Sequence, residues 1–168
     1  MRNGSGESES GVNQTLEFLS PDWIHEVVAR VESAKADDPY FRDLVAQFTL
    51  TTLYVVKNIP AALRKHCRGA DKLTFRVRVE RGTVKQIDFG LDPEDANADV
   101  VVQVDYKDAK KLFEGKLRPA IAVVTGRVKA KPTNGFSGWS KIAAKSVVTA
   151  GRILRTARKV PTTFGGKN

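Results

Sequence analysis

The chain has 168 residues, of which 41% are hydrophobic and 28% are charged, the composition of a globular protein with one domain and a sizeable core. No apolar run approaches the roughly 18 residues of a membrane-spanning helix. The start, MRNGSGESESGVNQ, lacks the basic-then-apolar layout of a secretory signal. The single cysteine, Cys67, excludes an internal disulfide and supplies no metal cluster. We therefore expect a cytoplasmic protein.

Charge is distributed unevenly along the chain, whose formal net charge is +9. Residues 1–114 hold 16 Lys or Arg against 19 Asp or Glu, which sums to −3. Residues 115–168 hold 12 Lys or Arg and no acid, which sums to +12. This polarity favours an anionic partner, such as a membrane surface, a nucleic acid or a ligand with phosphate or carboxylate groups.

The sequence predicts one folded domain over residues 17–160, between a disordered lead-in (1–16) and a flexible tail (161–168). Ser20-Pro21-Asp22 is the pattern of a helix start, and apolar residues recur at helical spacing to about residue 35. Asp37-Asp38-Pro39 ends this helix and begins a short second one.

A run of strands follows the two helices. Residues 48–56 (FTLTTLYVV) are β-branched and aromatic, and the alternation slips at Thr51-Thr52, which indicates a bulge. After a long basic loop, residues 73–80 and 83–91 alternate between apolar and polar residues and form an antiparallel hairpin. An acidic connection then leads to another strand over residues 100–105.

The last third of the chain is predicted as helix, helix, strand and helix. Asp105 caps a helix over 106–114, a second short helix spans 119–125, and 127–131 is the last strand. Residues 139–159 then form a long amphipathic basic helix. This order predicts an α+β fold, in which a single mostly antiparallel sheet of about five strands has helices packed on one face.

The order of short motifs resembles the sterol carrier protein 2 family of lipid-binding domains. Ala98-Asp99 precedes the strand at 100, and a Gly-Lys segment, a Pro-x-x-Ala helix and a Gly-basic-aliphatic strand follow it. The matching residues are Leu112, Gly115, Lys116, Leu117, Pro119, Ala122, Gly126, Arg127 and Val128. The segment FLSPDWI is also similar to a subgroup of small bacterial members. One departure is the insertion Pro132-Thr133-Asn134-Gly135 before the basic helix.

The resemblance implies an apolar tunnel between sheet and helices that takes a fatty acid, a fatty acyl-CoA or a sterol-like lipid without enzymatic chemistry or a cofactor. The segment FEGKLRPAIAVVTGRVKAKP (113–132) is then scaffold across one mouth of the cavity. The candidate wall residues, some of which belong to plain core, are Leu53, Val55, Phe75, Val77, Ile87, Phe89, Val102, Leu112, Phe113, Val124, Ile142 and Val147.

The basic helix supplies the candidate contacts to an anionic headgroup or a membrane, which are Lys141, Lys145, Arg152, Arg155 and Lys159. Each cation close to an anionic membrane contributes about 1 kcal/mol. The same face could instead steer acyl-CoA phosphates, or be a solvated surface. Nucleic acid fits the charge but is an unlikely partner, since no exposed aromatic platform or known motif accompanies it.

Catalysis and metal binding have little support in the sequence. His66-Cys67 lies among cations that would lower a thiol pKa, but no orienting carboxylate can be assigned, and His25 is expected to be solvated or to cap a helix. The segment DPEDANAD (92–99) lacks the glycine of an EF-hand loop and is expected to be a solvated connection. Two alternatives to a carrier stay open: a module that presents lipid to a partner enzyme or binds proteins, and an enzyme that uses the tunnel. Oligomeric state is left open.

Overall fold

The computed structural model describes residues 14–67, 71–94, 96–133 and 136–165. Most of the predicted lead-in, residues 1–13, lies outside this part of the chain. The described elements, in chain order, are β1 (Leu16–Glu17), α1 (Pro21–Asp37), α2 (Pro39–Val45), β2 (Leu50–Lys57), the 3₁₀ helix η1 (Ala61–His66), β3 (Lys72–Glu80), β4 (Thr83–Phe89), β5 (Val100–Asp105), α3 (Tyr106–Phe113), α4 (Pro119–Val124), β6 (Val128–Pro132), α5 (Trp139–Ala157) and β7 (Thr162–Thr163).

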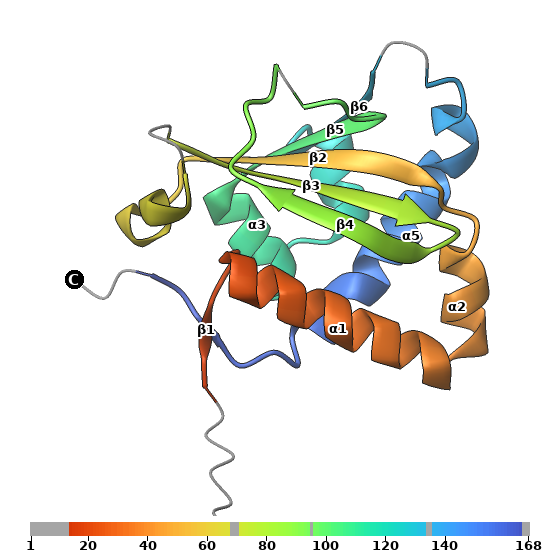
Figure 1. Ribbon diagram of the computed structural model, residues 1–168, viewed down its shortest axis with the longest axis horizontal. Coiled ribbons are helices and arrows are strands. Elements are labelled where there is room, and N and C mark those ends of the chain that lie inside the picture. The colour runs from red at the N-terminus through yellow and green to blue at the C-terminus, as the bar shows by residue number, and fades with distance from the viewer. Residues whose placement is uncertain (1–13, 68–70, 95, 134–135, 166–168) are drawn as a thin grey trace, which may run out of the picture.

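The main sheet has five strands in the order β4-β3-β2-β5-β6. The predicted hairpin is confirmed as the antiparallel pair β3 and β4, and β2 and β6 also pair antiparallel with their neighbours β3 and β5. Within this five-stranded sheet β2 and β5 are the one parallel pair, because the chain crosses over after β4 and returns beside the central strand. Figure 1 shows the helices gathered on one side of this sheet. The predicted α+β class, with a mostly antiparallel sheet, is therefore confirmed.

Three local predictions need correction. The register of β2 with β3 is regular through Thr51 and Thr52, and the irregularity lies instead at Arg78 and Val79, where β3 meets β4. The expected loop between β2 and β3 contains η1. Asp105 makes no side-chain cap hydrogen bond to α3, and its carboxylate accepts one from the Asn58 amide at 3.1 Å instead.

The starts of α1 and α2 lie where the sequence predicts them, and the cap predicted at Ser20 is confirmed. The Ser20 hydroxyl accepts a hydrogen bond from the Trp23 amide at 3.2 Å, and the Asp38 carboxylate accepts one from the Phe41 amide at 3.0 Å. Each cap is followed by a proline at the first helical position, where a missing N–H costs nothing.

The last residues of the domain differ from the expected flexible tail. Thr162–Thr163 forms β7, which pairs parallel with β1, and the Trp23 indole donates to the Thr162 hydroxyl at 2.9 Å. Phe164 packs against the main core cluster. The two ends of the described chain therefore hold each other beside α1.

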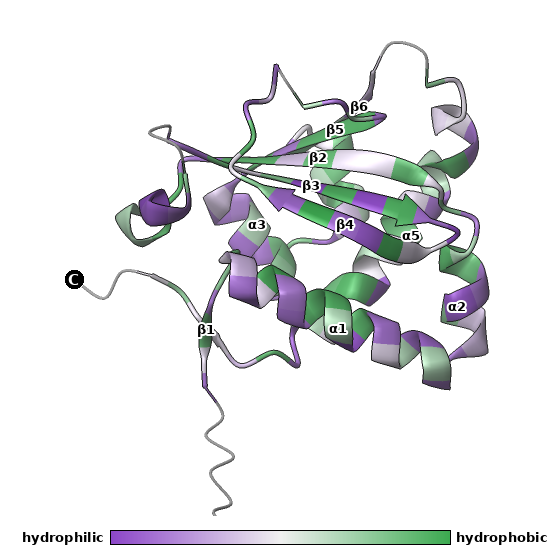
Figure 2. Cartoon of the chain, in the orientation of Figure 1, coloured by the Kyte–Doolittle hydropathy of each residue, from purple (hydrophilic) through white to green (hydrophobic). Residues whose placement is uncertain are grey.

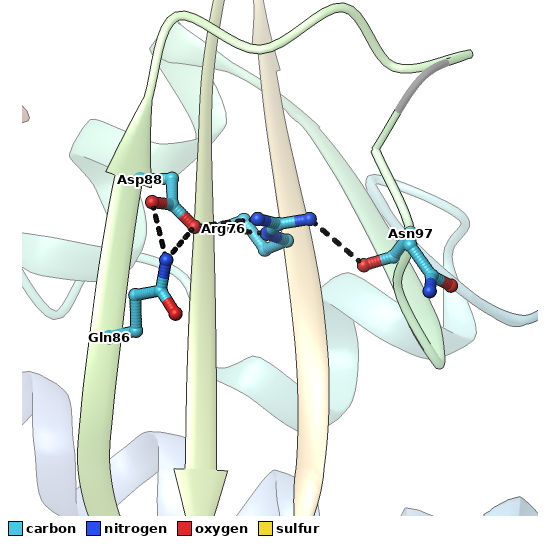
Figure 3. A network of polar contacts seen from close by, with 4 residues as sticks. All are labelled: Arg76, Gln86, Asp88 and Asn97. Atoms are coloured by element: carbon cyan, nitrogen blue, oxygen red, sulfur yellow. Dashed lines mark hydrogen bonds and ion pairs between the residues drawn. The ribbon is translucent and has the colours of Figure 1, made fainter.

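The sheet face away from the helices is covered in part by the acidic connection between β4 and β5. Figure 3 shows Arg76 of β3 between Asp88 of β4 and the Asn97 carbonyl oxygen of this connection. The guanidinium lies 2.8 Å from the Asp88 carboxylate and 3.4 Å from that oxygen. Hydrogen bonds from Arg76, and then from Gln86, hold the pKa of Asp88 below its ordinary value of 3.8.

We predict that Asp88→Asn lowers the free energy of unfolding at neutral pH. Because the folded-state pKa is lowered, the carboxylate stabilises the fold above its ordinary pKa, and this stabilisation is lost as pH falls through the folded value. Denaturant unfolding is measured at pH 7 and at steps below pH 4 (roughly the ordinary carboxyl pKa). The unfolding free energies of the wild type and Asp88→Asn should become equal as the pH falls. Asp43→Asn is the control, because that side chain is 76% exposed. A difference in unfolding free energy between the wild type and Asp88→Asn that persists at low pH would contradict the prediction.

Gly82 joins the β3–β4 hairpin to the helical layer. Its φ is +78°, its amide donates to the Phe48 carbonyl oxygen at 2.9 Å, and its own carbonyl oxygen accepts from the buried Lys35 ammonium at 2.8 Å. A Cβ built on Gly82 would lie 2.5 Å from the Val45 carbonyl oxygen. The hairpin turn is therefore fixed against both α1 and the end of α2.

We predict that Gly82→Ala costs about 3 kcal/mol of stability, from left-handed strain and from backbone overlap together. Gly126→Ala is the matched control, since Gly126 has φ +70° but nothing within 4 Å of its built Cβ. It should cost only about 1 kcal/mol. Urea unfolding followed by circular dichroism measures both, and equal costs would mean that the close approach to Val45 is unimportant.

Candidate functional site

The helix-covered face of the sheet is apolar but incompletely buried. Cross-strand register places on this face the predicted wall residues Phe75 and Val77 of β3, Ile87 and Phe89 of β4, and Val102 of β5. Of these only Phe75, with 9% exposure, is buried, and the other four are half-buried. Figure 2 shows the alternation of hydrophobic and hydrophilic residues along β3 and β4 that produces this face. The helices therefore do not seal the apolar surface they cover.

Leu53 and Val55 do not belong to this face, contrary to the prediction. They are buried on the opposite side of β2, in a cluster with Ala98 against which Leu91 and Val101 pack. The residues of β2 that point toward the helices are Tyr54 and Val56. Leu53 and Val55 are therefore core under the β4–β5 connection.

Of the four predicted wall residues on α3 and α5, Phe113 and Ile142 contact hydrophobic core clusters. Phe113 of α3 is buried in the main cluster, while Leu112, Ile142 and Val147 are half-buried. Ile142 of α5 packs against the cluster formed by α2 and the residues after it. Val124 is excluded from any interior wall, because its side chain is 83% exposed on α4.

A groove with a volume of about 430 Å³ lies between α2 and α5. Tyr40 and Leu44 of α2 and Ala144 and Val148 of α5 form its apolar part, with Asp43, Gln47 and Lys145 as polar neighbours. The Lys145 ammonium donates to the Gln47 side-chain oxygen, which ties the two sides of the groove together.

Two buried hydroxyl groups have no hydrogen-bond partner among the described residues. They are Thr149 Oγ1 on α5 and the Tyr106 hydroxyl at the start of α3. Burial, together with the nearby Glu17 carboxylate, raises the pKa of Tyr106 to about 12, so this group is a neutral donor at physiological pH. Burial also raises the pKa of Tyr54, whose ring stacks on Phe75 with centroids 4.8 Å apart. Unpartnered buried hydroxyls are available to a bound molecule.

The five predicted headgroup cations are not equally free. Arg152 donates to the Asp38 carboxylate at 2.8 Å, its guanidinium lies 4.6 Å from the Tyr40 ring centroid, and Lys145 is bound to Gln47. The exposed remainder of the set is Lys141, Arg155 and Lys159.

Residues with catalytic or metal-binding chemistry stay apart. Burial raises the pKa of the Cys67 thiol, which keeps it protonated and weakly nucleophilic, and its Sγ donates to the Leu63 carbonyl oxygen at 3.5 Å. The exposed His25 ring lies 5.5 Å from the Phe89 ring centroid. Within the described ranges no three His, Cys, Asp or Glu residues are grouped to hold a metal ion. No helix of those ranges is long and apolar enough to cross a membrane.

Sequence reasoning missed Tyr54, Val104 and Ile153, which pack against the main core cluster, and Thr149, which is buried on α5. In the predicted basic helix, apolar residues recur at the helical period of 3.6, and Ile153 is one of them, so the sequence did contain a signal for this residue. The α2–α5 groove had no sequence signal, because it depends on how two distant helices pack.

Solved structures of similar fold support this architecture. A Thermus thermophilus protein described as a possible sterol carrier protein is 17% identical, with a TM-score of 0.64 over 89% of this chain and 94% of that chain. A crystal structure of sterol carrier protein 2 is also 17% identical, with a TM-score of 0.63 over 86% of this chain and 99% of that one. At such identities the likeness shows the fold.

A search of curated protein sequences finds no significant match. The model of the SCP-2 sterol transfer family, in contrast, matches residues 42–131, which include β2 to β5, helices α3 and α4, and all but the last residue of β6. This match covers more than half of the chain, and with the shared fold it shows that the protein belongs to the SCP-2 sterol transfer family.

Proposed function

We propose that the protein is a non-enzymatic lipid carrier, which binds one fatty acid, fatty acyl-CoA or sterol-like molecule between the sheet and the helices. The observation that carries this proposal is the incomplete cover of one part of the helix-covered face. On this face Val56, Leu73 and Val100 are at most 2% exposed, whereas Val77, Ile87 and Val102 are only half-buried. An apolar guest would complete the cover that side chains leave unfinished.

Hydrocarbon burial supplies enough free energy for such binding. Moving one methylene from water to an apolar site is worth about 0.8 kcal/mol, so a chain of roughly 12 to 16 carbons needs few polar contacts. The unpartnered Thr149 hydroxyl is a candidate partner for a ligand oxygen. The α2–α5 groove, whose sides are linked by Lys145 and Gln47, is a candidate entrance.

The outer face of α5 is proposed to contact anionic headgroups or a membrane. Lys141 and Arg155 of α5 and Lys159, two residues after its end, are exposed, and residues 115–168 contain no acid. Arg152 and Lys145 are assigned to the link between α5 and α2 instead.

Mass spectrometry of solvent extracts from the purified protein tests the carrier function. We expect released lipid at close to one molecule per chain. A densely packed interior without lipid, in a protein that also takes up no added fatty acid, would favour the alternative of a protein-interaction module.

We predict that Val77→Trp weakens binding of a fluorescent fatty acid at least about tenfold, because the indole fills space meant for the lipid. Val101→Trp is the matched control, since Val101 is a half-buried strand valine on the opposite face. Its affinity should equal that of the wild type. Denaturant unfolding of Val77→Trp gives a second reading: a loss of about 1–3 kcal/mol with unchanged lipid affinity would show an already filled interior.

We predict that replacing Lys141, Arg155 and Lys159 together by Glu lowers binding to anionic vesicles by about a hundredfold at low salt. The control replaces Arg64, Lys65 and Lys72, which are exposed around η1 and the start of β3, with the same change in net charge. Vesicle cosedimentation across a salt series measures both. Equal losses would mean that overall charge, and not the α5 face, attracts the vesicles.

A further inference from the structure

One buried hydroxyl of α5 has no hydrogen-bond partner, although two other hydroxyls of the same helix do. The Ser146 hydroxyl donates to the Ile142 carbonyl oxygen at 2.9 Å, and the Thr156 hydroxyl donates to the Arg152 carbonyl oxygen at 3.2 Å. This bond to the carbonyl four residues back is the usual local solution for such side chains in a helix. Thr149 is only 8% exposed, yet its Oγ1 makes no hydrogen bond within the described part of the chain. A buried hydroxyl without a partner costs free energy, which makes Thr149 a candidate contact for a bound molecule.

Thr149 lies on the face of α5 that is turned toward the loosely covered interior. It shares this face with Ile142, seven residues before it, and Ile153, four residues after it. Ile142 packs against the cluster of α2, and Ile153 packs against both that cluster and the main one. On β3, the half-buried Val77 packs against the main cluster and the half-buried Val79 against the α2 cluster. Thr149 is therefore one helical turn from the place where the two clusters meet.

The groove between α2 and α5 reaches the same turn of α5 from outside. Lys145 and Val148 line this groove, and they precede Thr149 by four residues and by one residue. Val148 is 50% exposed, whereas Thr149 is buried. Thr149 thus lies between the proposed entrance and the apolar interior, where the polar end of a lipid would be held while its hydrocarbon chain lies further inside.

The charged groups of the helices packed around α5 are already paired. Arg152 of α5 binds the Asp38 carboxylate at 2.8 Å. Lys35 of α1 is the only buried cation among the described residues, and its ammonium lies 2.6 Å from the Glu32 carboxylate and 2.8 Å from the Gly82 carbonyl oxygen. A ligand carboxylate enclosed in this layer would find no unpaired buried cation there. Burying an ion without a partner costs far more than burying a hydroxyl or carbonyl group that makes one hydrogen bond.

We propose that Thr149 selects the polar group of the lipid, and that this group is an uncharged oxygen, either of a hydroxyl or of an ester carbonyl. This inference rests on the proposed carrier function and deepens it. The Thr149 hydroxyl can accept a hydrogen bond from a ligand hydroxyl or donate one to a ligand carbonyl oxygen. The exposed Lys145 lies at the surface, so a carboxylate held by it would keep the polar end of the ligand outside the interior.

The first test compares dodecanol, methyl dodecanoate and dodecanoate at about pH 8, where the carboxyl group is ionised. Each ligand displaces the neutral dye Nile red from the full chain. We expect the wild type to bind the alcohol or the ester at least about tenfold more tightly than the carboxylate. Thr149→Val should weaken binding of that neutral ligand about three- to tenfold and leave binding of dodecanoate unchanged. The difference between alcohol and ester identifies which oxygen the hydroxyl binds.

Two variants of the same helix are the controls. Thr149→Ser retains the hydroxyl and should keep the affinity of the wild type for the neutral ligand. Thr156→Val makes the same chemical change where the hydroxyl already has a partner, so all three affinities should stay unchanged. Denaturant unfolding of the ligand-free protein gives a second reading. Thr149→Val should raise the unfolding midpoint, because it removes a buried hydroxyl without a partner, and Thr156→Val should not.

Several outcomes would overturn the proposal. Unchanged affinities in Thr149→Val, or equal losses for the neutral ligands and dodecanoate, would show that the hydroxyl does not read the ligand. A loss of alcohol or ester binding in Tyr106→Phe that Thr149→Val does not show would assign the contact to the other unpartnered hydroxyl. A wild type that binds all three ligands equally would refute selection and leave the carrier function intact, whereas a wild type that binds none would refute both.

Discussion

The aromatic packing around Phe18 is the contact on which the helical layer depends. Its ring centroid lies 4.9 Å from that of Trp23, 5.1 Å from Phe113 and 5.3 Å from Phe164. These partners come from α1, the end of α3 and the residue after β7, so one buried ring joins elements from both ends of the domain. Aromatic pairs at such distances contribute beyond the area they bury. The β1–β7 pairing completes this attachment with backbone hydrogen bonds.

A second attachment lies where the hairpin turn at Gly82 meets Val45 and Lys35. With the helices fixed through Phe18 and again at this turn, the sheet between the two attachments need not be tightly covered. Val77 and Ile87 are half-buried there, although both belong to the helix-covered face. A fold held at separate points can thus keep a loosely covered apolar interior without losing its overall packing, and this is the property a lipid carrier requires.

The sequence determined some features of the fold by local rules and left others to tertiary packing. Alternation along β3 and β4, the cap at Ser20 and the helix start at Asp37-Asp38-Pro39 are local and were predicted correctly. The faces of β2 were not, because a central strand is apolar on both sides and its period carries no information about which side meets the helices. Leu53 was predicted as a wall residue and Tyr54 was not, yet Tyr54 packs against the main core cluster and Leu53 lies on the opposite face.

The cationic surface was also predictable from the sequence only in part, because tertiary packing decides which of its cations are free. Composition alone reveals that the last third of the chain is cationic, but not which cations are free, since the partner of Arg152 is Asp38, 114 positions away. Likewise the apolar sequence of α4 is equally compatible with a buried wall and an exposed surface. Only the packing of Ala122 inward turns Val124 out. On β6 the register pairs Lys129 with Gln103 and Lys131 with Val101, on the sheet face away from the helices, whereas Lys141 and Arg155 are exposed on α5. The cations of the last third of the chain are therefore divided between the two sides of the sheet, and no pattern in the sequence separates the two groups.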